Sequence, residues 1–312
     1  MPVVLITGGT GLIGKNLTRH LTGKGYEVII VSRNPPRSSD NPMIRYAAWN
    51  LDEQRIDPAA IATADHIINL AGAGVMEKKW THTYRKTIVE SRVKSNELII
   101  KALQENSNKV KTVISSSAIG WYGEDAATLP HAHGFIETDP AAQGFLGDTC
   151  RLWEESVDAA GALHKRVLKL RTGIVLSNDG GAFDEFKKPL RFGIAAILGS
   201  GKQVISWIHM DDLCRMYLYV IEHEQLVGIY NANAPLPVSN KKLILQTAQR
   251  TRGQFYVPVH VPKFLLKWVL GQRSIEILKS TTVSCEKIKQ AGFTFLYPSI
   301  DAALKDLIKK HP

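Results

Sequence analysis

Three glycines with the spacing of a dinucleotide-binding turn follow the first apolar run of the chain. The run VVLIT (3–7) leads directly into GGTGLIG (8–14), and a helical pattern follows. Gly8 allows a tight turn, Gly11 lets the backbone approach a pyrophosphate, and Gly14 lets the helix pack closely on the strand. A helix N-terminus also offers N–H donors to phosphates. The motif therefore predicts a dinucleotide site rather than a ligand-free turn. The other candidate cofactor contacts at this turn are Thr7, Leu12 and Ile13.

The end of the next apolar run indicates which dinucleotide binds. An NAD site usually places a carboxylate there to accept hydrogen bonds from the ribose 2′-hydroxyl. The run EVIIVSR (27–33) instead ends in Ser32 and Arg33 and has no acid at this point. The forked donors of Arg33 suit a 2′-phosphate, and Ser32 adds a hydroxyl. A solvated loop arginine is the alternative, but the missing acid and the present base together predict NADP(H).

A third turn follows DHIINLAG (65–72). The carboxyl end of such a strand faces the cofactor in dinucleotide-binding sheets. Small residues there let the backbone approach the adenosine–ribose half, although an ordinary strand-to-helix turn would have the same composition. The candidate cofactor contacts at this turn are Asn69, Leu70, Ala71 and Gly72.

The elements that must position these turns alternate between strand and helix. Helical patterns cover 13–23 and 84–105, and further apolar runs cover 111–117 and 166–176. Such alternation implies βαβ units, and runs rich in Val, Ile and Leu suit a sheet covered on both faces. We therefore expect an α/β protein with a doubly wound parallel sheet, the Rossmann fold.

The regular alternation of strand and helix patterns ends after Gly180-Gly181, where glycine turns and proline-containing loops follow. We expect a dinucleotide-binding domain over residues 1–178, to which 204–230 returns. The expected smaller substrate-binding lobe comprises 179–203 and 231–312. No internal repeat or low-complexity linker marks a sharp boundary.

Composition restricts the class of the protein and the compartment in which it is expected. The chain has 312 residues, of which 44% are hydrophobic and 22% charged, as in folded globular proteins. Its three cysteines have no disulfide or metal-ligand spacing, which favours the cytoplasm. The N-terminus has no basic region of a signal peptide. No apolar run approaches the ~20 residues of a membrane span, so no membrane partner is expected.

The charge balance is basic, with a formal net charge of +10. The lysines and arginines are scattered apart from short runs, and no basic helix with interleaved aromatic residues is evident. We therefore expect an anionic small molecule rather than nucleic acid. The sequence leaves open whether the protein is a monomer or a homodimer.

GGTGLIG, NLAG and SSSAIGWYG (115–123), in this order, resemble the extended branch of the short-chain dehydrogenase/reductase superfamily. Further motifs, among them GFLGDTCRLWEE and LGSGKQVISWIHMDD, are similar to an epimerase-like subfamily of unsettled substrate. The resemblance covers essentially the whole chain. It implies a small-molecule substrate, such as a nucleotide-sugar-like compound. It also implies that Arg92, in VESRVKSN, and Ser116 lie at the cofactor, and that the substrate-lobe candidates are Gln203, Trp207 and His209.

The resemblance also exposes a gap in the catalytic residues. In this superfamily a tyrosine exchanges the proton during hydride transfer, and a lysine four residues later lowers the tyrosine pKa. In the extended branch a glutamate commonly follows the lysine by four. Aligning that glutamate to Glu154 puts Cys150 at the lysine position and Leu146 at the tyrosine position. We therefore expect the usual Tyr-x-x-x-Lys pair to be absent and Cys150 to be a packed residue.

Other groups are candidates for the missing acid. Ser117 matches the superfamily serine, with Ser116 as the alternative, and Tyr122 follows the same strand. His209 near Asp211 is a further candidate, although an aspartate there also suits a helix cap. Glu124, beside Tyr122-Gly123, is another candidate. His131 and His133 lack a third ligand, so no metal is predicted. Two functions follow: an NADP(H)-dependent oxidoreductase or epimerase with an atypical acid, or an NADPH-binding protein without turnover.

Overall fold

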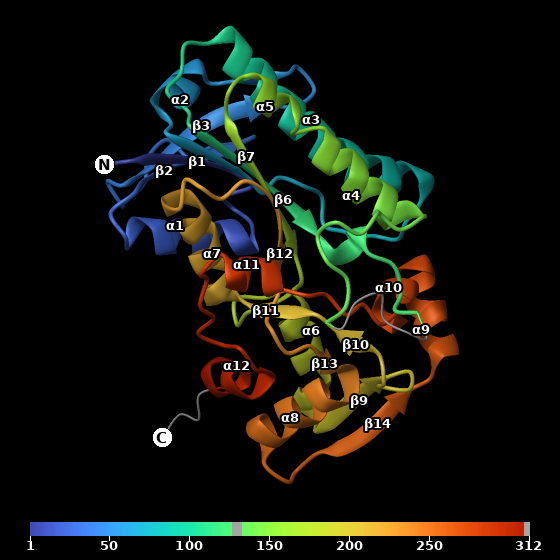
Figure 1. Ribbon diagram of the computed structural model, residues 1–312. Coiled ribbons are helices and arrows are strands. Elements are labelled where there is room, and N and C mark those ends of the chain that lie inside the picture. Colours follow the sequence, from blue (N-terminus) through green and yellow to red (C-terminus); the bar gives the residue numbers. More distant parts are fainter. Residues whose placement is uncertain (127–132, 309–312) are drawn as a thin grey trace.

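Eight strands form one twisted sheet in a computed structural model that describes residues 1–126 and 133–308 (Figure 1). In chain order they are β1 (Val3–Thr7), β2 (Glu27–Ser32), β3 (Ile44–Asn50), β4 (Arg55–Ile56), β5 (His66–Asn69), β6 (Thr112–Ala118), β7 (Arg166–Thr172) and β12 (Gly228–Ala232). Their spatial order is β12-β7-β6-β5-β1-β2-β3-β4. Every neighbouring pair is parallel except β3 with β4. The strand order runs outward in both directions from β1 and β5.

Helices cover both faces of this sheet. They are α1 (Leu12–Thr22), α2 (Pro58–Thr63), α3 (His82–Glu105), α4 (Phe145–Glu155), α5 (Ala159–Ala162) and α7 (Met210–Glu222), with the 3₁₀ turn η1 (Ile119–Trp121) after β6. Successive side chains of β1 point to opposite faces. Val4 and Ile6 pack in the cluster that includes α1 and α7. Val3 and Leu5 pack in the cluster that includes α2, α3 and α5. The predicted doubly wound parallel sheet is confirmed.

The apolar run 166–176 forms two strands rather than one. The chain leaves the sheet after β7 at Gly173, whose N–H donates to Ala232 O. The next residues form β8 (Ile174–Leu176), which pairs with β11 (Trp207–His209) outside the large sheet. A Cβ at Gly173 would lie 2.9 Å from Ser206 O, so glycine is needed at this crossing. The sequence pattern missed this break because only one residue, Gly173, separates the two strands.

The remaining elements form a lobe below the large sheet in Figure 1. Its strands are β9 (Ile194–Leu198), β10 (Val204–Ile205), β13 (Val238–Ser239) and β14 (Val257–Val261), paired as β10–β13 and β9–β14. Its helices are α6 (Ala182–Lys187), η2 (Pro189–Phe192), α8 (Asn240–Arg252), α9 (Lys263–Leu270), η3 (Gly271–Arg273), α10 (Ser274–Leu278) and α12 (Ile300–Leu307). The helix α11 (Glu286–Gln290) packs instead against β12 of the large sheet, and its Ile288 belongs to the cluster that includes α1 and α7. Among the described residues, no helix combines the length and apolarity that crossing a membrane requires.

The expected division into two domains stays a prediction. The 204–230 segment supplies α7 and most of β12, and β12 ends at Ala232, two residues beyond the expected boundary. Two apolar clusters, which include α8 and α12, form the interior of the lobe. In such folds ligands bind at the carboxyl ends of the parallel strands, which here include Thr7 of β1 and Asn69 of β5.

The packing of α1 on the glycine turn gives a stability test. A Cβ on Gly14 would lie 2.4 Å from Gly8 O and 2.5 Å from Gly9 Cα. We expect Gly14→Ala to lower the free energy of unfolding by roughly 1–3 kcal/mol in urea denaturation, because backbone must move. The control Gly161→Ala in α5 meets no atom within 4 Å and should keep or raise stability. Equal stability of the two variants would contradict the close helix–strand contact.

Candidate functional site

The glycine turn leaves the N-terminus of α1 open. Gly11 is the N-cap, and no side chain caps the helix. Gly8 has a φ of +68°, and a Cβ there would approach the Leu70 carbonyl carbon to 2.8 Å. A Cβ on Gly11 would meet only Gly8 O, at 3.3 Å. Gly8 and Gly14 are thus required by the packing of the protein itself. Gly11 borders open space beside uncapped N–H donors, which suits a pyrophosphate.

Thr7 and Asn69 lie side by side at the carboxyl ends of β1 and β5, where the strand order reverses. Thr7 Oγ1 donates to Asn69 Oδ1. The Asn69 amide donates to Ser95 Oγ at 2.9 Å and to Asn96 Oδ1 at 2.5 Å. Both side chains are fully buried, so they position the turn. The surface of the turn comes from half-buried Leu70 and exposed Gly72, whereas Ala71 is buried.

Ser32 and Arg33 lie at the end of β2. Arg33 is exposed and Ser32 is half-buried, and Ser32 Oγ accepts a hydrogen bond from Asn34 N at 3.4 Å. Within the described ranges 1–126 and 133–308, the Arg33 guanidinium has no hydrogen-bond partner. Its donors therefore remain available to an anion.

Arg92 lies on α3 beneath the turn that follows β5. Its Nη1 donates to Ile88 O at 2.8 Å and to Ala73 O at 3.0 Å. Its Cζ lies 4.8 Å from the centre of the Trp153 ring, and a Cβ on Gly72 would approach that Cζ to 3.0 Å. Only 9% of Arg92 is exposed, and burial lowers its pKa. The guanidinium is thus fixed beside the backbone of Gly72.

Leu146 and Cys150 lie one turn apart on α4 and pack against η1. A Cβ on Gly120 would be 3.5 Å from Leu146 Cβ and 3.6 Å from Cys150 Sγ. The Cys150 thiol donates weakly to Ala118 O at 3.7 Å. Burial, and secondarily the nearby Glu154, raise the pKa of Cys150 to about 12. The thiol is therefore protonated at neutral pH and packs as a small apolar group.

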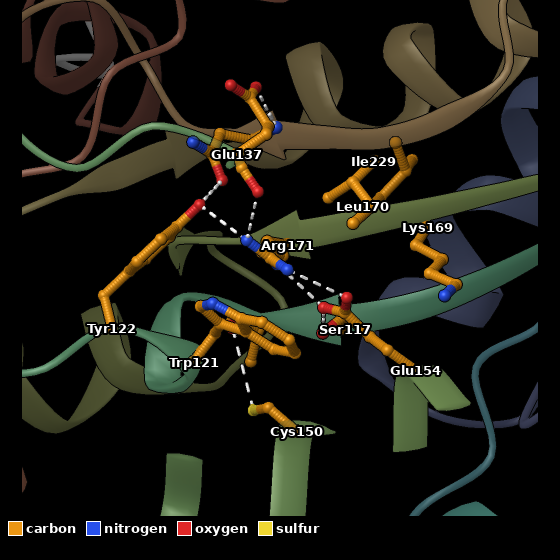
Figure 2. Close-up of polar contacts among 12 residues, drawn as sticks. Ser117, Trp121, Tyr122, Glu137, Cys150, Glu154, Lys169, Leu170, Arg171 and Ile229 are labelled. Carbon is orange, nitrogen blue, oxygen red and sulfur yellow. Dashed lines mark hydrogen bonds and ion pairs between the residues drawn. The ribbon is translucent and has the colours of Figure 1, made fainter. Parts of the chain in front are cut away.

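A buried polar network centred on Arg171 lies behind these residues (Figure 2). Arg171 Nε and Nη2 donate to the two carboxylate oxygens of Glu154 at 2.8 and 2.9 Å. Ser117 Oγ donates to Glu154 Oε1 at 2.7 Å. The Arg171 Cζ lies 3.7 Å from the centre of the Trp121 ring. Ser117 and Glu154 are only 2% and 3% exposed, so the serine hydroxyl is committed to a carboxylate inside the protein.

Tyr122 is the other end of the same network. Its hydroxyl donates to Asn231 Oδ1 at 2.7 Å and accepts from Arg171 Nη1 at 3.0 Å. Its ring stacks on Phe135 at 5.2 Å, and only 1% of the residue is exposed. Burial raises the pKa of Tyr122 to about 12 despite the opposing effect of Arg171. This hydroxyl therefore has both a donor and an acceptor partner within the protein.

Ser116, the alternative serine, is only 7% exposed on β6. Glu124 is exposed beyond Tyr122, and no hydrogen bond to its carboxylate is found within the described residues. Neither the buried serine nor the exposed glutamate is brought into the Arg171 network.

The three substrate-lobe candidates are all buried. Gln203 Nε2 donates to Leu198 O at 3.0 Å, and Trp207 Nε1 donates to Leu236 O at 3.0 Å. His209 is the N-cap of α7, where its Nδ1 accepts from Asp211 N at 3.1 Å. Their exposed fractions are 5%, 0% and 2%. The structure thus gives each of them an internal packing partner instead of a place on an open surface.

His209 also belongs to a cluster with Asp211 and Asp306, whose ligand atoms lie within 4.8 Å of one another. Because Nδ1 accepts the Asp211 N–H, the proton lies on Nε2, which is directed at Asp306 Oδ2 at 3.5 Å. A protonated Nε2 cannot ligate a metal. Burial lowers the pKa of His209. His133 is exposed, and His131 lies outside the described residues.

Sequence reasoning missed Arg171, Glu137 and Asn231. Glu137 O accepts from Arg171 Nη1 at 3.0 Å, and its carboxylate accepts from Asn231 N at 2.8 Å. One signal could have found them: Arg171 follows Leu168 and Leu170 in a strand of the central sheet, and a charge that is buried there requires a partner.

With this geometry in hand, the fold is that of a dinucleotide-binding protein of the short-chain dehydrogenase/reductase type. Residues 4–144 match the model of the NAD-dependent epimerase/dehydratase family, and residues 261–307 match a domain of unknown function, DUF1731. The chain is 34% identical over 307 residues to epimerase family protein SSP1921 of Staphylococcus saprophyticus, covering 97% of this chain and 98% of that protein. The chain therefore belongs to the NAD-dependent epimerase/dehydratase family, as the resemblance of its motifs predicted.

Two solved structures are similar over almost the whole chain. Human epimerase family protein SDR39U1, solved with NADPH, is 26% identical with a TM-score of 0.84, covering 99% of this chain and 100% of that one. A nucleoside-diphosphate sugar epimerase from Corynebacterium glutamicum is 29% identical with a TM-score of 0.76, covering 99% of this chain and 58% of that one. The predicted epimerase-like subfamily is confirmed.

The Arg171–Glu154 ion pair yields a stability prediction. We expect Glu154→Gln to lower the free energy of unfolding by about 3–5 kcal/mol, because it leaves a buried guanidinium without a counter-charge. Glu155→Gln is a matched control on the same helix, since Glu155 pairs with Arg151 at 2.9 Å on the surface. That change should cost less than about 1 kcal/mol. Urea denaturation measures the free energy of unfolding of both variants. Equal losses of stability would contradict a stabilising role of the buried Arg171–Glu154 pair.

Proposed function

We propose that this chain binds NADP(H) in the crevice at the carboxyl ends of β1 and β5 and acts on a small-molecule substrate of the epimerase-family kind. The observation that carries the proposal is the open glycine turn at Gly11, which adjoins the uncapped N-terminus of α1. The neighbour solved with NADPH, which is similar over the whole chain, supports the same cofactor. The cofactor would supply hydride chemistry, and the residues of the chain would bind and orient it.

Each end of the cofactor is assigned its own residues. The pyrophosphate would lie over Gly8, Gly11 and the first amides of α1, at Leu12 and Ile13. Arg33, with Ser32, would bind the 2′-phosphate, because no carboxylate competes at the end of β2. Gly72 would border the adenosine–ribose half, while Thr7 and Asn69 hold that turn in place. Arg92, fixed against Gly72, would contribute a positive charge farther along the crevice.

The nicotinamide end is proposed to lack the usual acid. Leu146 and Cys150 occupy successive turns of α4 where the family pair is expected, and neither has an ionised group at neutral pH. Ser117 and Tyr122 remain the catalytic candidates, but their hydroxyls are engaged by Glu154, Asn231 and Arg171. General acid–base help would therefore be weak. This engagement favours a second candidate function, an NADP(H)-binding protein that senses or is stabilised by the cofactor without turning over a substrate.

Cofactor preference tests the binding proposal. We expect Arg33→Ala to weaken NADPH binding by roughly tenfold to a hundredfold, because a charge-assisted contact with the 2′-phosphate is lost. NADH binding should stay nearly unchanged. Titration by isothermal calorimetry measures both affinities. Arg55→Ala, another exposed arginine on β4, should affect neither. Equal weakening of NADPH and NADH by Arg33→Ala would show that Arg33 has a different role.

Turnover tests the nicotinamide end. Without a positioned acid, NADPH oxidation with a panel of carbonyl compounds and sugar nucleotides should be about 10²- to 10⁴-fold below that of a relative with the pair. The change Leu146→Tyr with Cys150→Lys should raise this rate if it restores the pair. Cys150→Ala is the control for packing and should leave NADPH affinity unchanged. Fast turnover by the native protein would refute the proposed loss, and calorimetric NADPH binding would still stand on its own.

A further inference from the structure

The excess positive charge of the chain is confined to two segments of the lobe side. Residues 186–210 and 225–275 contain eleven lysines and arginines and no aspartate or glutamate. The whole chain has 39 basic and 29 acidic residues, so the remainder has 28 and 29 and is nearly neutral. The basicity that looked scattered along the sequence is therefore concentrated in one part of the molecule.

Most of these cations have no carboxylate partner. Among the described residues, ion pairs are formed by Lys187 with Asp184, Lys188 with Glu185, and Arg250 with Asp301. The other eight basic residues of the two segments pair with no acid in residues 1–126 and 133–308. Lys263 and Lys267, both exposed on α9, belong to this unpaired set. Their field is thus directed at the surroundings of the protein rather than compensated within it.

The same part of the molecule exposes an apolar sheet face. In the β9–β14 pair, Ala195 and Ile197 are buried in the cluster that includes residues of α8. Alternation places the intervening side chains on the opposite face, where the parallel pairing sets them side by side in two rows. This outer face consists of Ile194, Ala196, Leu198, Val257, Val259 and Val261. It contains no polar residue, and Val257 is 63% exposed.

Exposed aromatic residues stand at both ends of this sheet face. Phe192 and Phe255 are 84% and 87% exposed, and the strands start beside them, where Val257 N donates to Gly193 O at 2.8 Å. Phe264 and Trp268, one turn apart on α9, are 74% and 81% exposed. Figure 1 shows α9 following β14 at the outer edge of the lobe. Contrary to the expectation from sequence, KFLLKWVL is a helix that interleaves lysines with exposed aromatic residues.

We propose that this basic–aromatic face, formed by β9, β14, α9 and the aromatic residues Phe192 and Phe255, docks on the surface of an anionic lipid bilayer. The lipid phosphates would neutralise Lys263 and Lys267 of α9, each worth about 1 kcal/mol near an anionic surface. The aromatic side chains and the apolar strands would enter the interface between headgroups and acyl chains. The protein rests on the surface and does not span it.

Charge distinguishes this partner from the alternatives. A second copy of the chain would bring an equally basic face into contact, and like charges without counter-charges oppose association. A nucleic acid would neutralise the lysines but leave the apolar strand face in water, since its backbone contacts are polar. An anionic bilayer satisfies both features at once.

Vesicle flotation tests the proposal. The full-length protein is mixed with phosphatidylcholine vesicles with or without phosphatidylglycerol. We expect binding to the anionic vesicles only, with affinity falling as salt rises. Trp268 should contribute a blue-shifted fluorescence that Trp268→Phe removes. Lys263→Gln with Lys267→Gln should weaken binding at least about tenfold. The matched control Lys24→Gln with Lys111→Gln changes exposed lysines outside the two segments and should have little effect.

Replacement of exposed apolar residues by serine provides a second test of membrane docking. Phe264→Ser with Trp268→Ser should weaken vesicle binding, whereas Val227→Ser with Leu296→Ser, also exposed apolar positions, should not. Circular dichroism and NADPH affinity show that each variant is folded. The proposal is overturned if anionic vesicles do not bind at low salt, or if neutral vesicles bind equally well. It is also overturned if the α9 changes act only on dimerisation in sedimentation velocity or only on binding to duplex DNA.

Discussion

The buried ion pair between Arg171 and Glu154 is the constraint on which the packing of α4 against the sheet depends. Removing two charges from water costs several kcal/mol for each ion, and close geometry with further hydrogen bonds must offset that cost. Here the guanidinium meets both carboxylate oxygens and lies against the Trp121 ring. Its remaining donor reaches Tyr122 and the Glu137 carbonyl. Because Arg171 comes from β7 and Glu154 from α4, this one pair fixes the helix against the sheet.

The same constraint limits the chemistry. A hydroxyl that serves as a general acid must be able to give its proton to a substrate. Ser117 gives its proton to Glu154, and Tyr122 gives its proton to Asn231. Redirecting Tyr122 would leave the buried Asn231 Oδ1 without a donor, which costs about 1–3 kcal/mol, and redirecting Ser117 would remove a hydrogen bond from the buried Glu154 carboxylate. The two hydroxyls that were catalytic candidates are therefore used for structure in this chain, while the N-terminus of α1 keeps its uncapped donors.

The sequence predicted the parts of the site that depend on backbone. Gly8, Gly11 and Gly14 could be assigned because a tight turn and a close helix–strand contact need glycine at fixed spacing, and the sheet followed from apolar periodicity. The Arg171 network could not be predicted, because its members come from positions 117, 122, 137, 154, 171 and 231 and only the fold brings them together. For the same reason the motif around Trp207 and His209 suggested a substrate contact, whereas tertiary packing buries both side chains.

Hydrogen bonds join the basic–aromatic face to the segment that follows β5. Helix α9 continues into η3, where Gln272 accepts a hydrogen bond from Arg85 at the start of α3 and Arg273 donates to Met76 O at 2.7 Å. Both partners belong to the segment that runs from the end of β5 into α3, the rim of the proposed cofactor crevice. Because η3 follows α9 directly, these two contacts fix the end of α9 against that rim. The lobe therefore places its surface chemistry one helix away from the nucleotide-binding turn of the sheet.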